Sequence, residues 1–170
     1  MTQLLSMTTQ YDVLILALNE LIEINNSRID GYKKATEDMD GGDLKGIFQG
    51  MIHESEGFAE ALTEHVIKFD GEPATESTVM GKLHQAWLDF KASIVSDNRE
   101  TILSSCEFGD KSALEVYETT LSLEKVKASP ELENLLMAQK SSISESLKII
   151  QSLKSSSHDA KEEQKVLENQ

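Results

Sequence analysis

Residues 70–97, DGEPATESTVMGKLHQAWLDFKASIVSD, decide the fold because they separate two pairs of long helical stretches. Apolar residues recur in this segment at helical spacing, at Leu83, Trp87, Phe90 and Ile94. The spacing predicts a helix from about Thr78 to Val95. Such a helix is about 26 Å long at about 1.5 Å per residue, which is close to the height of a helical bundle. The segment can therefore carry the chain from one end of a bundle to the other.

Short turns join the two helices within each pair. The first turn is Asp40–Gly42, where glycine tolerates the left-handed backbone of a helix C-cap. The second contains Ser129–Glu131, where Ser129 suits an N-cap and the proline suits the first helical position. Two antiparallel hairpins joined by a long crossover are typical of ferritin-like bundles. We therefore predict an all-α, ferritin-like four-helix bundle with an additional short crossover helix; a five-helix up-and-down array is the alternative.

The helical pattern divides the chain into three parts. The first helix is expected from Tyr11, so residues 1–9 are predicted to be an N-terminal extension and residues 10–154 the helical bundle. Residues 155–170 are polar and start with three serines, so they are predicted to form a disordered tail.

Charge and cysteine content exclude several classes of protein. Acidic residues outnumber basic ones 30 to 16, giving a net charge of −14, which repels nucleic acids and anionic membrane surfaces. The single cysteine cannot form an intrachain disulfide, and no apolar run approaches the ~20 residues that a bilayer span requires. The N-terminus lacks the basic and apolar regions of a signal peptide. We therefore expect a cytoplasmic protein that binds neither nucleic acid nor membrane.

Polar residues interrupt the apolar seam near the middle of each long helix. They are Asn25, Ser55, Asp110 and Gln139, with Glu107 close to Asp110 in sequence. Mid-helix positions of an antiparallel bundle meet at similar height, so these residues predict a polar layer across an apolar core. Because unpaired buried carboxylates cost several kcal/mol, Asp110 and Glu107 should be hydrogen-bonded, protonated, bound to a cation or turned toward solvent.

The layer lacks the ligand pattern of a di-iron centre. Such bundles use Glu-x-x-His on two helices, and none of the four histidines has a glutamate three residues before it: His53, His65, His84 and His158. We therefore expect no cofactor, and keep a weaker site for iron or another divalent metal at Glu107 and Asp110 as the alternative. If the layer is only structural, Asp110→Leu is expected to be neutral or stabilising.

Other reactive residues have simpler interpretations. Cys106 lies on an apolar face and is expected to be a core residue rather than a nucleophile. His84 and Trp87, one turn apart, are expected to pack on the bundle rather than to bind a ligand. The sequence shows neither a phosphate-binding glycine loop nor a nucleophile with a histidine base.

Two stretches of the chain resemble signatures of one family. Residues 81–91, GKLHQAWLDFK, resemble the Gly-x-Leu-His-x-x-Trp-x-Asp-x-Lys run of a bacterial family of ferritin-like four-helix-bundle proteins of unknown function. Residues 106–114, CEFGDKSAL, resemble its Cys-Glu-Arg-Gly-Glu-Asp signature. Further short sequences similar to those of the family lie at residues 30–32, 58–62 and 71–73, so the resemblance covers about residues 10–125. It implies the ferritin-like fold and no established activity.

The chain departs from these signatures at four positions. Phe108 and Lys111 replace an arginine and an acid, and Asp110 and Asp30 shorten typical glutamates, whereas Glu107 is kept. Each departure weakens a cation site carried over from the family.

Enzymatic activity is not indicated by these observations. We expect a non-catalytic bundle that acts by forming a homo-oligomer or by binding a protein partner. The alternative is a ferritin-like metal-binding protein or oxidoreductase with a reduced carboxylate site. A third hypothesis is an apolar ligand pocket near Trp87.

Overall fold

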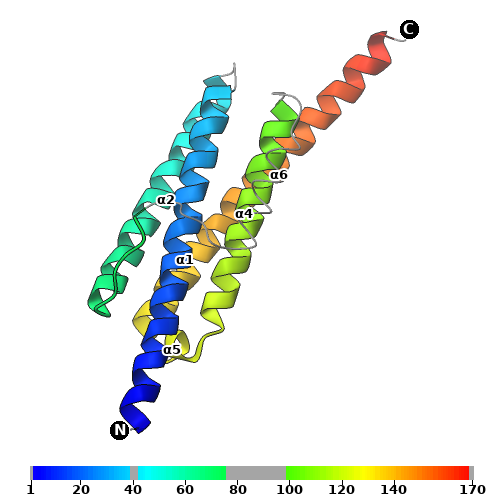
Figure 1. Cartoon of the computed structure of the whole chain (residues 1–170). Coiled ribbons are helices and arrows are strands. Elements are labelled where there is room, and N and C mark those ends of the chain that lie inside the picture. The colour runs from blue at the N-terminus through cyan, green and yellow to red at the C-terminus, as the bar shows by residue number, and fades with distance from the viewer. Residues whose placement is uncertain (1, 39–41, 76–98, 169–170) are drawn as a thin grey trace.

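The computed structural model describes residues 2–38, 42–75 and 99–168. Apart from the turns at residues 69–75, 122–123 and 128–129, these parts of the chain are helical, with no strand among them (Figure 1). The helices are α1 (Thr2–Asp38), α2 (Gly42–Lys68), α4 (Arg99–Leu121), α5 (Glu124–Lys127) and α6 (Pro130–Glu168). The all-α prediction is confirmed. None of the described helices is long and apolar enough to cross a membrane.

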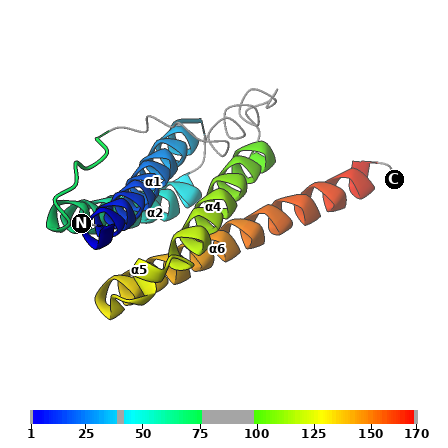
Figure 2. The same cartoon turned by 60° about the horizontal axis from the view of Figure 1, so that its bottom comes forward.

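The long helices form two antiparallel hairpins. The α1/α2 pair and the α4/α6 pair lie as two layers, which α1 and α4 join by packing against each other (Figure 2). Helices α2 and α4 run in the same direction, so the connection between them has to return along the length of the bundle (Figure 1). This arrangement confirms the predicted ferritin-like bundle of two hairpins. The predicted crossover helix, with His84 and Trp87, lies outside the described residues.

Two apolar clusters form the core, one toward each end of the bundle. The first includes the buried side chains of Leu18, Leu62, Val66, Leu132 and Leu136. The second includes those of Ile29, Phe48, Leu103, Cys106 and Ile150. Burying a large apolar side chain contributes about 1.5–3 kcal/mol, so the two clusters supply most of the stability. Cys106 is a core residue, as predicted.

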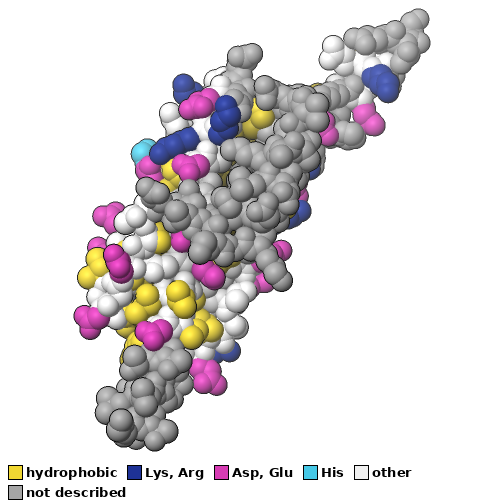
Figure 3. Space-filling model, viewed as in Figure 1, with side chains coloured by type: hydrophobic (Ala, Val, Ile, Leu, Met, Phe, Trp, Pro, Cys, Tyr) yellow, Lys and Arg dark blue, Asp and Glu magenta, His cyan; other side chains and the backbone are white. Residues whose placement is uncertain are grey.

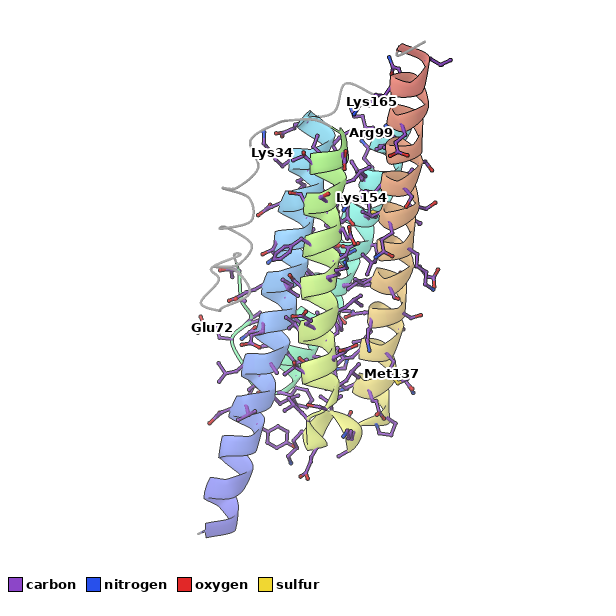
Figure 4. The ribbon with its side chains drawn as sticks, turned by 90° about the vertical axis from the view of Figure 1, so that its right-hand side faces the viewer. Lys34, Glu72, Arg99, Met137, Lys154 and Lys165 are labelled. Carbon is purple, nitrogen blue, oxygen red and sulfur yellow. The ribbon has the colours of Figure 1, made fainter. Side chains whose placement is uncertain are left out.

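The chain leaves α2 through a turn that is fastened to α1. Asp70 has a left-handed backbone with φ of 57°, and the Gly71 N–H donates to the Val66 carbonyl at 2.9 Å. Further along, the Asn19 amide donates to the Glu72 carbonyl at 2.9 Å and accepts from the Ala74 N–H at 2.8 Å. Figure 4 shows Glu72 beside α1. Asn19 therefore sets where the long connection begins.

Both ends of the chain differ from the prediction. The first helix begins at Thr2 rather than near Tyr11, because no glycine or proline interrupts the sequence there. The final helix continues to Glu168, so residues 155–168 are helical where a disordered tail was predicted over residues 155–170. The serines that suggested a break instead bond back to carbonyls one turn earlier, as Ser155 Oγ does to Gln151 at 3.0 Å, and the residues that follow are mostly good helix formers. The proposed boundaries at residues 9 and 154 fall inside continuous helices.

The one-turn helix α5 was not predicted. It lies between α4 and α6 and inserts the fully buried side chain of Val126 into the first apolar cluster. It thereby closes that end of the bundle.

Gly71 is expected to tolerate no larger residue. An added Cβ would lie 2.8 Å from Ile15 Cγ2 and 3.0 Å from Val66 Cγ1. Gly71→Ala should therefore lower the free energy of unfolding by about 1–3 kcal/mol, measured by urea denaturation. Gly57→Ala is the matched control, because an added Cβ there meets nothing within 4 Å in the middle of α2. It should raise stability by about 0.5–1 kcal/mol. Equal effects of the two substitutions would contradict this account.

Candidate functional site

Each long helix contributes polar side chains to a layer between the two apolar clusters. The predicted members Asn25, Ser55, Asp110 and Gln139 are all buried, which confirms the polar layer. Sequence reasoning missed Arg28, whose side chain is also buried. The sequence feature that could have identified Arg28 is its position on the apolar seam of the first helix, one turn after Asn25 and one turn before Tyr32.

Arg28 forms an ion pair with Asp110 at the centre of the layer. The Arg28 Nε donates to Asp110 Oδ1 at 2.9 Å, and the Tyr32 hydroxyl donates to Asp110 Oδ2 at 2.8 Å. The Arg28 Nη1 donates to Ser55 Oγ at 2.8 Å, and Ser55 in turn donates to the Met51 carbonyl. Both carboxylate oxygens of Asp110 are therefore bonded to other side chains, and α1 is connected to α2 and α4.

Burial and charge shift the pKa values of these groups in opposite directions. Burial raises the pKa of Asp110, and the Arg28 guanidinium offsets part of this effect. Burial acts to lower the pKa of Arg28, but the charge of Asp110, its hydrogen bond to Arg28, and the charges of Tyr32 and Glu54 together outweigh burial, so the pKa is raised. Burial and the nearby Asp110 raise the pKa of Cys106 to about 12. The Cys106 thiol is therefore protonated at neutral pH and unsuited to nucleophilic chemistry.

A second set of hydrogen bonds completes the layer on the side of the first apolar cluster. The Asn25 Nδ2 donates to the Tyr117 hydroxyl at 2.8 Å, and that hydroxyl donates to Gln139 Oε1 at 2.8 Å. The Gln139 Nε2 donates to the Phe58 carbonyl at 3.4 Å. This chain passes through all four long helices. Burial raises the pKa of Tyr117, so its hydroxyl stays protonated and can keep both bonds.

Glu54 extends the layer toward solvent between α2 and α6. Its carboxylate accepts from Ser142 Oγ at 2.5 Å and from Ser146 Oγ at 3.3 Å. The Arg28 Nη2 lies 3.8 Å from Glu54 Oε1, too far for a hydrogen bond. Glu54 is thus a second carboxylate facing the guanidinium, with its side chain 24% exposed.

Glu107, the other predicted site residue, belongs to a different cluster on the α4/α6 surface. Its carboxylate accepts from the Lys111 Nζ at 2.6 Å and from the Lys154 Nζ at 2.9 Å; Lys154 is labelled in Figure 4. These hydrogen bonds, with a further one from Gln151, lower the pKa of Glu107 to about 2. Glu107 and Asp110 share none of these partners, so the ion pairs that hold the two carboxylates are separate.

The described donor set does not fit a di-iron centre. Among the side chains that the structure describes, no three of histidine, cysteine, aspartate or glutamate are grouped so that they could hold a metal ion. His53 pairs with Glu56 at 3.2 Å on the exposed face of α2, away from the core. The carboxylates of the layer instead face an arginine and hydroxyl groups.

The fold and this core define a ferritin-like helical bundle. The chain belongs to the family described as a domain of unknown function (DUF2383), which matches residues 13–125. This membership agrees with the resemblance to a ferritin-like family of unknown function. No curated protein matches the chain by sequence.

Solved structures share the fold at low sequence identity. The chain is similar to a protein of Bacillus anthracis described as one of the "ferritin like, diiron-carboxylate proteins", with a TM-score of 0.71 and 18% identity over 85% of this chain and 97% of that one. It is also similar to a mutant of Dps1 from Mycobacterium smegmatis, with a TM-score of 0.69 and 11% identity over 86% of this chain and 97% of that one. At these identities the similarity establishes the fold alone.

The Arg28–Asp110 pair changes the expected effect of Asp110→Leu. The substitution was expected to be neutral or stabilising if the polar layer is only structural. Because Asp110 is paired with Arg28, its removal would instead leave the Arg28 charge buried and unpaired. We now expect a loss of about 3–5 kcal/mol in the free energy of unfolding at pH 7, measured by urea denaturation. The double variant Arg28→Met/Asp110→Leu should recover most of that loss, because it removes both charges.

The exposed residue Asp12 provides the control for this comparison. Asp12→Leu should change stability by less than about 0.5 kcal/mol. An Asp110→Leu variant as stable as the wild type, or a double variant no more stable than Asp110→Leu, would contradict the role given to the ion pair.

Proposed function

We propose that this protein is a non-catalytic, cytoplasmic helical bundle that acts by associating with itself or with a protein partner. The observation that carries this proposal is that the protein's own side chains already bind the carboxylates that could form a reactive site. The side chains around Asp110 already satisfy both of its oxygens, and Glu107 is neutralised by lysines. The described part of the core therefore offers structural bonds rather than a reactive group.

One end of the α1/α2 hairpin offers a surface for association. Exposed apolar side chains at that end are Tyr11, Val13 and Leu16 on α1 and Ile67 on α2. The Tyr11 and Phe69 rings lie 5.8 Å apart, so the start of α1 and the end of α2 are neighbours. Figure 3 shows apolar side chains gathered on the lower half of this face. Such clusters favour protein association when they are contiguous.

Because the chain is strongly acidic, the effect of salt distinguishes self-association from binding to a basic partner. Two copies with a charge of −14 each repel one another, so added salt should strengthen self-association. A basic partner would be attracted by the same charge, so added salt should weaken that complex.

Light scattering coupled to size-exclusion chromatography tests the proposal. We expect a dimer or larger species at low micromolar concentration, and at least about a tenfold loss of affinity in Leu16→Glu, because the charge would be buried in the contact. Ile149→Glu is the matched control, since Ile149 is an exposed apolar residue on α6. A monomeric wild type that also binds no protein partner would refute the proposal, and equal effects of the two variants would refute the assigned surface.

A ferritin-like metal-binding protein or oxidoreductase is the second candidate function. It is supported by the fold shared with a protein described as a diiron-carboxylate protein, and it would use Glu107 and Asp110 as ligands. Under the primary proposal, elemental analysis of protein purified without chelators should find no stoichiometric iron, manganese, copper or zinc. Stoichiometric metal that is lost in both Glu107→Gln and Asp110→Asn would favour the second candidate.

A further inference from the structure

The Arg28 guanidinium lies where oxygen atoms from two neighbouring helices converge. Asp110 Oδ1 approaches it from α4 at 2.9 Å, and Ser55 Oγ approaches it from α2 at 2.8 Å. Glu54 Oε1, also on α2, lies 3.8 Å from the remaining nitrogen. Two carboxylates and a hydroxyl therefore surround one positive group in the middle of the bundle.

Carboxylates converging on the core of a helical bundle are also the arrangement that holds divalent metals. Hard divalent cations prefer oxygen ligands of this kind. Here the positive charge at the convergence is supplied by α1 itself, and it is permanent because an arginine is not deprotonated in proteins. A divalent ion at the same point would have to lie against the guanidinium, and repulsion between the two cations opposes this.

The remaining contacts hold the guanidinium in its position. Its central carbon lies 5.6 Å from the centre of the Tyr32 ring, within the range of a cation–π interaction. The Tyr32 hydroxyl donates to the second oxygen of Asp110, so each oxygen of this carboxylate accepts one hydrogen bond within the layer. Among the three nitrogens of the Arg28 guanidinium, only Nη2 lacks a hydrogen-bond partner, and it faces Glu54.

We propose that Arg28 is the resident cation of the polar layer and excludes divalent metals from it. The oxygens of Asp110, Glu54 and Ser55 form a cation site that becomes available to a metal ion only when the guanidinium is removed. This inference is independent of the proposed association and predicts that the wild-type core binds no divalent metal.

Metal titrations of three Arg28 variants test the proposal. In Arg28→Glu a third carboxylate replaces the guanidinium, so Co²⁺ should bind with visible absorption bands, and Mn²⁺ should raise Tm by about 5–10 °C at about 100 times the Kd. The response should be lost in Arg28→Glu/Asp110→Asn. Arg28→Lys is the matched control, because it keeps the positive charge and should respond to neither metal. The wild type should respond to neither metal either.

Each result decides the proposal. Co²⁺ binding by the wild type that is abolished by Asp110→Asn would overturn it, because a metal would then share the layer with Arg28. A folded Arg28→Glu without a metal response would also overturn it. If Arg28→Glu folds only with Mn²⁺ present, the proposal is supported. If it folds in neither condition, Arg28→Gln decides, since this neutral variant should gain weaker Mn²⁺-dependent stabilisation and its failure to do so overturns the proposal.

Discussion

The buried ion pair between Arg28 and Asp110 is the constraint on which the rest of the bundle depends. It joins α1 to α4, the two helices that bring the hairpins together. A buried pair of this kind adds little net stability over apolar residues, but separating its members leaves an uncompensated charge. Sliding one hairpin past the other by a helical turn would separate them. We infer that the pair fixes the register of the hairpins, while the apolar clusters on either side supply the stability.

The same pair shows how one fold can hold different chemistries. A ferritin-like bundle gathers side chains from four helices at mid-height, and the identity of those side chains determines what the core can bind. In this chain the Asn25–Tyr117–Gln139 hydrogen bonds and the Arg28–Asp110 pair fill that space with the protein's own groups. Similarity to a protein described as a diiron-carboxylate protein therefore establishes the architecture of this chain and not what its core binds.

The sequence predicted the parts of the structure that periodicity controls. Asn25, Ser55, Asp110 and Gln139 stand at seam positions, so their burial followed from helical spacing alone. The partners did not follow: an arginine such as Arg28 usually reaches solvent, and only the carboxylate on another helix explains its burial. The ion pair between Glu107 and Lys154 on α6 likewise depends on how the helices pack, which the sequence pattern does not show. Residues 155–168 were predicted to be disordered because they are polar. A helix can nevertheless form from residues that bury little surface, so polarity alone did not exclude it.

Helix α6 is much longer than its neighbour α4, with 39 residues against 23. The two helices stay in register as far as Arg99, the first residue of α4, whose side chain donates to Ser157. Beyond that point α6 projects past the bundle (Figures 1 and 2). The described side chains from 160 to 167 are exposed, and a solvated helical end opens and re-forms within about a microsecond. Amide hydrogen exchange should therefore be fast there and slow abruptly at the bundle, so that the end can unwind without disturbing the core.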